Sequence, residues 1–263
     1  MKKLWLIKSY FTYLMKAKSR YVIHSPFVFE LLNKVLRDKT EYDDYALIDK
    51  IKREQSARED IMETVDFGAS AGESAYKTMM LRKGIIVKQR TAQKSQLELL
   101  YRLSKFLKPE VILELGTAAG ISASYLKKGN PSSKLITLEG CANLADLAED
   151  TFKKLNLKDI EVISGNFDVT LNEVIANEKR LDLVFFDGNH RKEPTLKYFN
   201  SCLKLANENT LFIFDDIHWS SGMEEAWEAI KANPEVSITI DLFWMGLVFF
   251  KKGFAKQDFI IKY

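Results

Sequence analysis

The sequence is poor in the residues that build secreted scaffolds and metal clusters. Its 263 residues include two cysteines, three histidines and five prolines. Cys141 and Cys202 are too few for a disulfide framework, so we expect both to be reduced in a cytoplasmic protein. Neither has a partner at the spacing of a zinc site, and three histidines leave little room for one. Disulfide-rich secreted domains and zinc modules are therefore disfavoured.

Long apolar runs and a strong net charge are also missing. No stretch reaches the roughly 18 apolar residues that span a bilayer, so we expect no membrane span. The formal net charge of +3 is mild and does not by itself require nucleic acid. The chain is nevertheless 46% hydrophobic, which is enough for one full-sized core with a modest extra segment beside it.

Basic residues are concentrated at the start of the chain. The first twenty residues contain no acid, four aromatic residues and the basic residues Lys2, Lys3, Lys8, Lys16, Lys18 and Arg20. A basic amphipathic helix can lie on a membrane or on RNA, but we favour a surface helix packed on its own domain. Lysines interrupt the apolar run and no small-residue cleavage site follows, so the segment does not resemble a signal peptide.

Residues 1–92 are expected to form an N-terminal helical extension or lid. Apolar residues from Val28 to Leu36 recur at helical spacing after the start signal Ser25-Pro26. Residues 65–90 are less regular and contain Gly68, Gly72 and Gly84, so we interpret them as a loop. A further helix is predicted over 96–107, at the start of a second domain that spans 93–263.

From residue 111 onward the pattern changes to alternating strands and helices. Five β-type runs, at 111–115, 135–138, 160–163, 181–186 and 211–214, are separated by helical stretches at 121–128, 144–155, 169–177, 193–205 and 223–232. This alternation predicts an α/β fold with a doubly wound, mostly parallel sheet covered on both faces. Two more runs, 236–243 and 246–251, are too close for a helical crossover. They predict an antiparallel terminal hairpin and seven strands in all.

The first predicted strand runs into a glycine loop, Glu114-Leu115-Gly116-Thr117-Ala118-Ala119-Gly120. Ligands of doubly wound sheets bind beyond such strand ends, where glycines allow positive φ and close approach to the backbone. The dinucleotide pattern G-x-G-x-x-G lacks its middle glycine here, which disfavours a dinucleotide-dependent oxidoreductase. The next strand ends at Glu139, where a carboxylate is placed to accept hydrogen bonds from ribose hydroxyls.

Together, Glu114, the glycine loop and Glu139 resemble the cofactor motifs of class I S-adenosylmethionine-dependent methyltransferases. The segment 111–123 is similar to the catechol and caffeoyl-CoA O-methyltransferase branch, and the resemblance covers about residues 93–252. It implies a Rossmann-like methyltransferase fold with S-adenosylmethionine as cofactor. It implies that the residues beside the cofactor are Glu114, Gly116, Thr117, Ala118, Gly120, Ser122, Glu139, Gly165, Asn166, Phe167, Asp168 and Asp187.

Within that set the resemblance implies separate roles. Ser122 lies where the family often places a hydroxyl near the cofactor carboxylate, and Glu139 holds the ribose. Phe167 covers the adenine ring and Asp168 accepts from its amino group. For Phe167, simple packing in the core remains the alternative.

Acidic residues follow the fourth and fifth predicted strands. Asp187 follows the fourth strand, and Asp215 and Asp216 follow the fifth. If the strands are neighbours, three carboxylates share one small volume, which requires a cation, a shared proton or a basic partner. Hard oxygen ligands of this kind suit Mg²⁺ or Ca²⁺. The branch that the chain resembles binds a divalent metal at these three positions, although Asp216 replaces its usual Asn. Alternatively, Asp215 and Asp216 cap the following turn and Asp187 faces the sulfonium.

His190 and Asp187 are the predicted catalytic residues. Catechol-type relatives place a basic lysine three residues after the first Asp, where this chain has His190, whose imidazole can accept the acceptor's proton. Sugar-type relatives use an acid one residue earlier, where this chain has Asn189. His190 alternatively caps the next helix. We expect His218 and Trp219 to border the acceptor, and Trp244 and Met245 to lie in the core.

The predicted function is methylation of a small-molecule hydroxyl, with a divalent metal assisting. The runner-up is tRNA methylation, in which the basic N-terminal helix and Lys127-Lys128 contact phosphates. A dinucleotide-dependent oxidoreductase and a cofactor-binding protein without catalysis are weaker alternatives. The sequence is compatible with a monomer or a homodimer.

Overall fold

A central sheet organises the computed structural model, which describes residues 2–17, 24–66 and 76–263. Its strand order is β10-β8-β9-β7-β6-β3-β4-β5. The strands are β3 (Val111–Leu115), β4 (Lys134–Glu139), β5 (Ile160–Ser164), β6 (Leu183–Phe186), β7 (Leu211–Asp215), β8 (Ile238–Asp241), β9 (Met245–Phe249) and β10 (Gln257–Ile260). The five strands from β7 to β5 pair in parallel, and β9 is antiparallel to both β7 and β8. The predicted doubly wound sheet and its terminal hairpin are confirmed.

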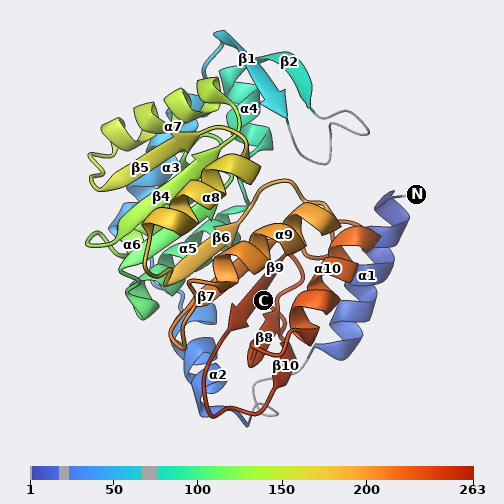
Figure 1. Cartoon of the computed structure of the whole chain (residues 1–263). Helices are drawn as coiled ribbons and strands as arrows, with labels where there is room; N and C mark the ends of the chain where they lie inside the picture. Colours follow the sequence, from blue (N-terminus) through green and yellow to red (C-terminus); the bar gives the residue numbers. More distant parts are fainter. Residues whose placement is uncertain (1, 18–23, 67–75) are drawn as a thin grey trace.

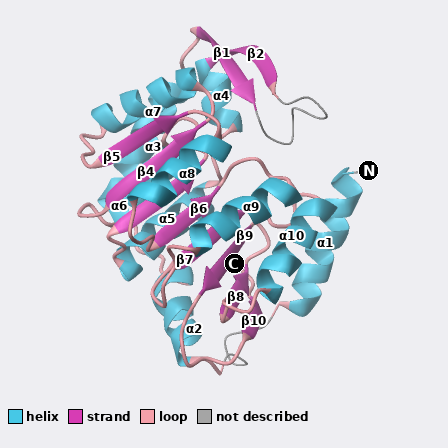
Figure 2. Cartoon of the chain, viewed as in Figure 1, coloured by secondary structure: helices cyan, strands magenta, loops and turns pink. Residues whose placement is uncertain are grey.

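Helices cover both faces of this sheet, as Figures 1 and 2 show. Alternate strand residues face opposite sides, so Ile112 and Leu113 belong to different apolar clusters. The Ile112 cluster includes residues of α5 (Lys94–Leu107), α6 (Ile121–Gly129) and α7 (Ala142–Lys154). The Leu113 cluster includes residues of α8 (Phe167–Asn177), α9 (Lys192–Leu203) and α10 (Ser221–Ala232). Each face is thus a core of its own, and the ligand edge lies between them.

The main sheet has one strand more than the seven predicted. β10 pairs in parallel with β8, with Gln257 opposite Ile238. Phe259 of β10 and Ile261, which follows the strand, are buried in the core. The prediction stopped at the hairpin because these two residues stand among charged neighbours and give only a short alternation.

Strand and helix occupy most of the described part of the loop predicted over residues 65–90, and residues 67–75 lie outside the described part. β1 (Ile61–Asp66) and β2 (Lys77–Arg82) pair antiparallel, and α4 (Lys83–Gln89) follows. Met62 and Thr64 of β1 are buried while Ile61 and Glu63 are exposed, so the strand has period 2. The loop prediction was wrong because it relied on glycines. Of these, Gly68 and Gly72 lie outside the described residues.

The remaining N-terminal elements pack at several places around the sheet. They are α1 (Lys2–Lys16), α2 (Pro26–Leu31), the π-helix η2 (Leu32–Leu36) and α3 (Asp43–Ser56). Ser25 caps α2, as predicted, because its hydroxyl accepts a hydrogen bond from the backbone N–H of Val28 at 3.4 Å. Val28 and Leu31 belong to the same core cluster as Ile112 of the sheet. The division of the chain at residue 92, and a lid role for the part before it, stay predictions.

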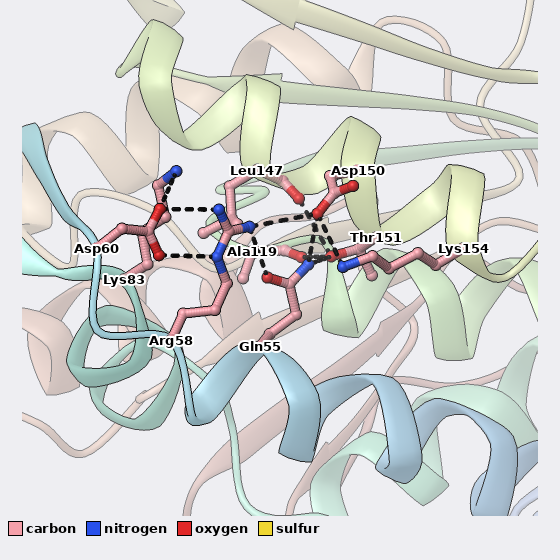
Figure 3. Close-up of polar contacts among 9 residues, drawn as sticks. All are labelled: Gln55, Arg58, Asp60, Lys83, Ala119, Leu147, Asp150, Thr151 and Lys154. Atoms are coloured by element: carbon pink, nitrogen blue, oxygen red, sulfur yellow. Dashed lines mark hydrogen bonds and ion pairs between the residues drawn. The ribbon is translucent and has the colours of Figure 1, made fainter.

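A polar network fastens the end of α3 to α7 and, through it, to the glycine loop (Figure 3). Arg58 pairs with Asp60 at 2.8 Å and with Asp150 of α7 at 3.4 Å. The buried Gln55 donates to the hydroxyl of Thr151 at 3.1 Å. Thr151 in turn donates to the backbone carbonyl of Ala119 at 2.8 Å. The N-terminal segment therefore supports the loop that begins the site.

No helix among residues 2–17, 24–66 and 76–263 has both the length and the apolar character needed to cross a bilayer.

Candidate active site

A cavity of about 930 Å³ opens at the carboxyl ends of the central strands. This edge includes the point where the chain, having built β3, β4 and β5 outward, returns to β6 on the other side of β3. Ten of the predicted site residues line it: Gly116, Ala118, Glu139, Asn166, Phe167, Asp168, Asp187, His190, Asp215 and Asp216.

Gly116 shows why the loop after β3 needs glycine. Its φ is +106°, and a Cβ there would lie 2.4 Å from the carbonyl oxygen of Asp187. Gly120, at φ +74°, would place a Cβ 2.7 Å from the ring of Phe152. The positive φ predicted for these glycines is confirmed, and close approach of a ligand to them stays a prediction. The loop therefore passes directly against the segment that carries Asp187.

Behind the loop, Glu114 is fully buried in a chain of hydroxyl groups. Thr137 donates to Glu114 Oε2 at 2.6 Å, and the Thr117 and Thr137 hydroxyls are 2.6 Å apart. Glu114 Oε1 has no hydrogen-bond partner among the described residues. Burial raises the pKa of Glu114 to about 7, against the opposing hydrogen bonds of Ser122 and Thr137. This carboxyl group is thus poorly satisfied on one oxygen.

Glu139 is held rigidly at the cavity wall. Its Oε2 accepts from the backbone N–H of Ala118 at 2.8 Å and its Oε1 from that of Cys141 at 2.9 Å. Burial raises its pKa, while these backbone N–H groups and Arg90 act in the opposite direction. Each carboxylate oxygen can accept more than one hydrogen bond, so both retain capacity toward the cavity.

The segment after β5 forms another part of the cavity wall. Asn166 caps α8, since its side chain accepts from the backbone N–H of Asp168 at 2.9 Å. The ring of Phe167 lies 6.0 Å from that of Tyr198, centre to centre. Asp168 lines the cavity, but its carboxylate already pairs with Lys197 at 2.9 Å. A ligand amino group would therefore compete with Lys197 for Asp168.

The three carboxylates predicted to meet do share one wall. β6 and β7 are neighbours, with Phe186 opposite Phe214, so the residues that follow them lie side by side. The side chains of Asp187 and Asp215 are hydrogen-bonded to each other. Burial, reinforced by the neighbouring carboxylates, raises the pKa of both well above the ordinary range. Both carboxyl groups therefore favour the neutral form more than ordinary aspartates do.

Asp216 and His190 complete this acidic wall. Burial raises the pKa of Asp216, and the nearby His190 acts in the opposite direction. The Nε2 atom of His190 lies 3.6 Å from Asp187 Oδ1. Among the residues that the structure describes, no group of three His, Cys, Asp or Glu is arranged to hold a metal ion. The oxygen donors suit Mg²⁺ chemically, but Asp187 and Asp215 bond to each other instead of converging on a common centre.

Gln96, at the start of α5, is a site residue that sequence reasoning missed. Its side-chain amide donates to Asp215 Oδ1 at 3.2 Å and its carbonyl oxygen accepts from the backbone N–H of Gln93 at 2.9 Å. Gln93 and Gln96 form a reciprocal capping box. Their spacing, just before an apolar helix, was the signal available in the sequence.

The aromatic residues near the acidic wall differ in part from prediction. Trp219 lines the cavity as expected, and Met245 is buried in the core. Trp244 also lines the cavity, so its assignment to the core was wrong. The turn between β8 and β9 places it there: Phe243 has φ +72°, and the Trp244 carbonyl accepts from the backbone N–H of Asp216 at 2.7 Å.

His218, expected beside the acceptor, instead lies between two acids. Its ring nitrogens are each 2.9 Å from a carboxylate oxygen, Nδ1 from Glu224 and Nε2 from Asp241. The ring also stacks on Phe243. Burial lowers the pKa of His218, but the two acids outweigh burial and the pKa is raised. This histidine therefore joins α10 to the end of β8.

Comparison with known proteins agrees with this geometry. Residues 113–217 match the model of a methyltransferase domain family. The chain is 29% identical over 126 residues to a catechol O-methyltransferase from Niastella koreensis, covering 47% of this chain and 56% of that protein. It is 37% identical over 79 residues to a tRNA (guanine-N(7)-)-methyltransferase from Mycoplasma mobile, covering 29% and 39%. It thus spans about half the length, or less, of these curated relatives.

Among solved structures, the O-methyltransferase of Bacillus cereus in complex with S-adenosylhomocysteine is similar. The TM-score is 0.57 at 21% identity, over 85% of this chain and 97% of that one. This likeness shows a shared fold. Residues 113–217 are thus similar to a methyltransferase domain, and the chain shares the fold of that O-methyltransferase.

Proposed function

We propose that the protein transfers the methyl group of S-adenosylmethionine to a hydroxyl oxygen of a small molecule. The observation that carries this proposal is that Gly116 lies directly against the acidic wall of the cavity. The glycine loop, where only glycine fits, lies against the segment of Asp187 inside a cavity of about 930 Å³. A cavity of that size accommodates a drug-sized ligand.

The residues present fit this cofactor. S-adenosylmethionine carries a sulfonium and an ammonium group, and Asp187, Asp215 and Asp216 line the cavity as a cluster of acids. Bound positive charge would lower their raised pKa values and favour their charged form. Glu114 Oε1 is a buried acceptor without a partner among the described residues. Gly116 would pass beside the methionine part of the cofactor, and Glu139 would hold the ribose. Phe167 and Asn166 would border the adenine.

His190 is the residue that we propose as the base. It lines the cavity and its ring lies within 3.6 Å of Asp187, so an acceptor hydroxyl on this wall would find an imidazole close by. The site then aligns the acceptor oxygen with the methyl group, and alignment itself supplies a large part of the rate. Trp219 and Trp244 form aromatic walls that suit an aromatic or otherwise flat acceptor.

A divalent cation held by Asp187, Asp215 and Asp216 is a further part of the proposal. The donor set supports it, because three clustered carboxylates favour a hard cation. Such an ion, once bound, would lower the pKa of a hydroxyl that coordinates it. Ion binding would require Asp187 and Asp215 to give up their mutual hydrogen bond.

The central test is calorimetry of S-adenosylhomocysteine binding, with and without Mg²⁺ or Ca²⁺. We expect binding in both conditions, weakened by Glu139→Ala and retained by Glu173→Ala, a variant on α8 away from the cavity lining. Absence of binding in every condition would contradict the proposed function. Binding that Mg²⁺ leaves unchanged, together with turnover that a chelator leaves unchanged, would contradict the metal alone.

RNA is the alternative acceptor, and the tRNA methyltransferase relative favours testing it. The lysines named for phosphate contact do not support it. Lys127 is buried and donates to the carbonyl of Ser133, and Lys128 pairs with Asp44 at 3.3 Å. A tRNA acceptor would reveal itself by binding that falls steeply with added salt.

Cys141 and Cys202 are free and buried, which supports the expected cytoplasmic setting.

A further inference from the structure

The first helix, α1, has two very different faces. One face is fastened to the domain: Tyr13 donates to the carbonyl of Ile261 at 2.6 Å, and Ser9 donates to Glu224 at 2.8 Å. Tyr10 and Tyr13 both pack on the ring of Phe243. The orientation of the helix is therefore fixed by contacts on this face.

The opposite face is apolar and open. Ile7, Phe11 and Met15 are 54%, 61% and 80% exposed. They are spaced four residues apart, so they form one strip along the helix, about 12 Å from the first residue to the last. Soluble surfaces scatter such residues singly, and a continuous strip marks a site of interaction.

The charge around this strip has one sign. α1 contains four lysines and no acid, and the exposed Lys8 and Lys16 lie along one side of the apolar strip. The acids of α10, which lies beside α1 in Figure 1, are each engaged by a partner. Glu224 binds His218, Glu225 pairs with Lys192 at 2.7 Å, and Glu228 pairs with Lys231 at 2.7 Å. The uncompensated charge on this side is therefore positive.

We infer that α1 docks this protein on an anionic lipid bilayer, with Ile7, Phe11 and Met15 inserted at the boundary of headgroups and acyl chains. A basic helix with an apolar face lies in the plane of a membrane in this way, without crossing it. A second copy fits less well, because two strips face to face would bring lysines against lysines. The strip is also far smaller than the roughly 800 Å² per partner of a stable interface. This docking surface is separate from the cavity and does not depend on the proposed function.

The test is sedimentation of the full chain with vesicles. Vesicles of pure phosphatidylcholine are compared with vesicles containing about one third phosphatidylglycerol. We expect binding to the anionic vesicles that weakens as salt is added. Phe11→Ser with Met15→Ser should lower the partition coefficient roughly tenfold or more. Phe29→Ser, which removes a phenylalanine 47% exposed on α2, is the matched control and should bind like the wild type.

Two further experiments distinguish a membrane from a second copy of the chain or tRNA as the partner of α1. Lys8→Gln with Lys16→Gln should weaken binding roughly tenfold at low salt and less at high salt. Fluorescence of the Phe11→Trp variant, quenched by brominated lipid, reports insertion even if the double serine variant folds poorly. The proposal is overturned by absence of vesicle binding, or by binding that the serine variant retains. The membrane proposal is also contradicted if the wild type forms a dimer that the serine variant does not form. It is contradicted equally if tRNA binds in a way that depends on the lysines but not on Phe11.

Discussion

At Gly116 two independent constraints meet. The backbone has φ +106°, and a Cβ would lie 2.4 Å from the Asp187 carbonyl. We expect Gly116→Ala to lose about 2–4 kcal/mol of stability, from backbone strain plus the steric clash, and to abolish binding of S-adenosylhomocysteine. Gly253→Ala is the control, since φ there is +76° but no atom lies within 4 Å of a Cβ. Chemical denaturation should show only about 1 kcal/mol of loss for this control. Equal losses in the two variants would refute the close-approach argument.

Gln96 positions the acidic wall through its hydrogen bond to Asp215. Gln96→Ala removes a donor from a buried carboxyl group, and we expect kcat to fall roughly tenfold while affinity for S-adenosylhomocysteine stays within about twofold. Gln96→Glu, which places another acid against Asp215, should lower kcat further. Turnover and calorimetry on the same preparations check this split. An equal loss of affinity and rate would mean that Gln96 supports the cofactor site as a whole.

Residue roles were predictable where sequence neighbours decide them and not where tertiary contacts do. Glu139 and Asp187 could be placed because Glu139 ends β4 and Asp187 directly follows β6, both at the edge of the cavity. His218 also follows such a strand, yet the acids Glu224 and Asp241 hold it elsewhere. Trp244 belongs to a hairpin whose apolar pattern favours burial, but the positive φ of Phe243 determines where it lies. These contacts join residues that only the tertiary fold brings together, so the local sequence does not reveal them.

Between elements, the polar network of Figure 3 joins the end of α3 to α7, and we expect its residues to contribute unequally to stability. Thr151 is buried and bridges Gln55 to the carbonyl of Ala119. Thr151→Val therefore removes a donor from the Ala119 carbonyl and an acceptor from Gln55. The side-chain nitrogen of Gln55 then keeps only its 3.3 Å bond to Asp150. We expect this substitution to lower the free energy of unfolding by about 1–3 kcal/mol and to weaken cofactor binding through the glycine loop. Lys154→Ala removes only an exposed ion pair with Asp150 and should cost less than about 1 kcal/mol. Urea denaturation of both variants ranks them, and a larger effect of Lys154→Ala would reverse this assignment.

Among elements, long and regular patterns were predictable while short ones were not. The five parallel strands with their helices repeat one alternation, and the predicted ends of β3 agree with the structure. β10 has four residues at the edge of the sheet, and β1 has only a brief alternation beside glycines. Such strands depend on pairing partners distant in sequence, Ile238 for Gln257 and Arg82 for Ile61. Local pattern alone does not contain that information.

For the molecule as a whole, buried acids make stability depend on pH. The pKa of Glu114 is raised to about 7, so the folded state holds a proton that the unfolded chain releases above its ordinary pKa of 4.5. This contribution is fully present below pH 4.5 and is lost as pH rises through 7. We therefore expect the free energy of unfolding to fall across this window, by up to about 3 kcal/mol from this group.

Glu114→Gln should flatten that part of the profile and stabilise the protein above pH 7. Urea unfolding at several pH values between about 5 and 8 measures this pH dependence of the free energy of unfolding. Glu110→Gln, at a residue whose side chain is 74% exposed, should leave the slope unchanged. A wild-type protein that becomes more stable as pH rises through this window would contradict the predicted sign.

The hydrogen bond between Tyr13 and Ile261 joins residues that are 248 positions apart in the sequence. During synthesis α1 therefore leaves the ribosome well before the residue that anchors it. Contacts of such separation form late, because a long loop must close before they contribute. The apolar strip and the tyrosine face of α1 therefore stay exposed together until Ile261 has emerged. The strip is then available to a surface before the helix has docked on its own domain.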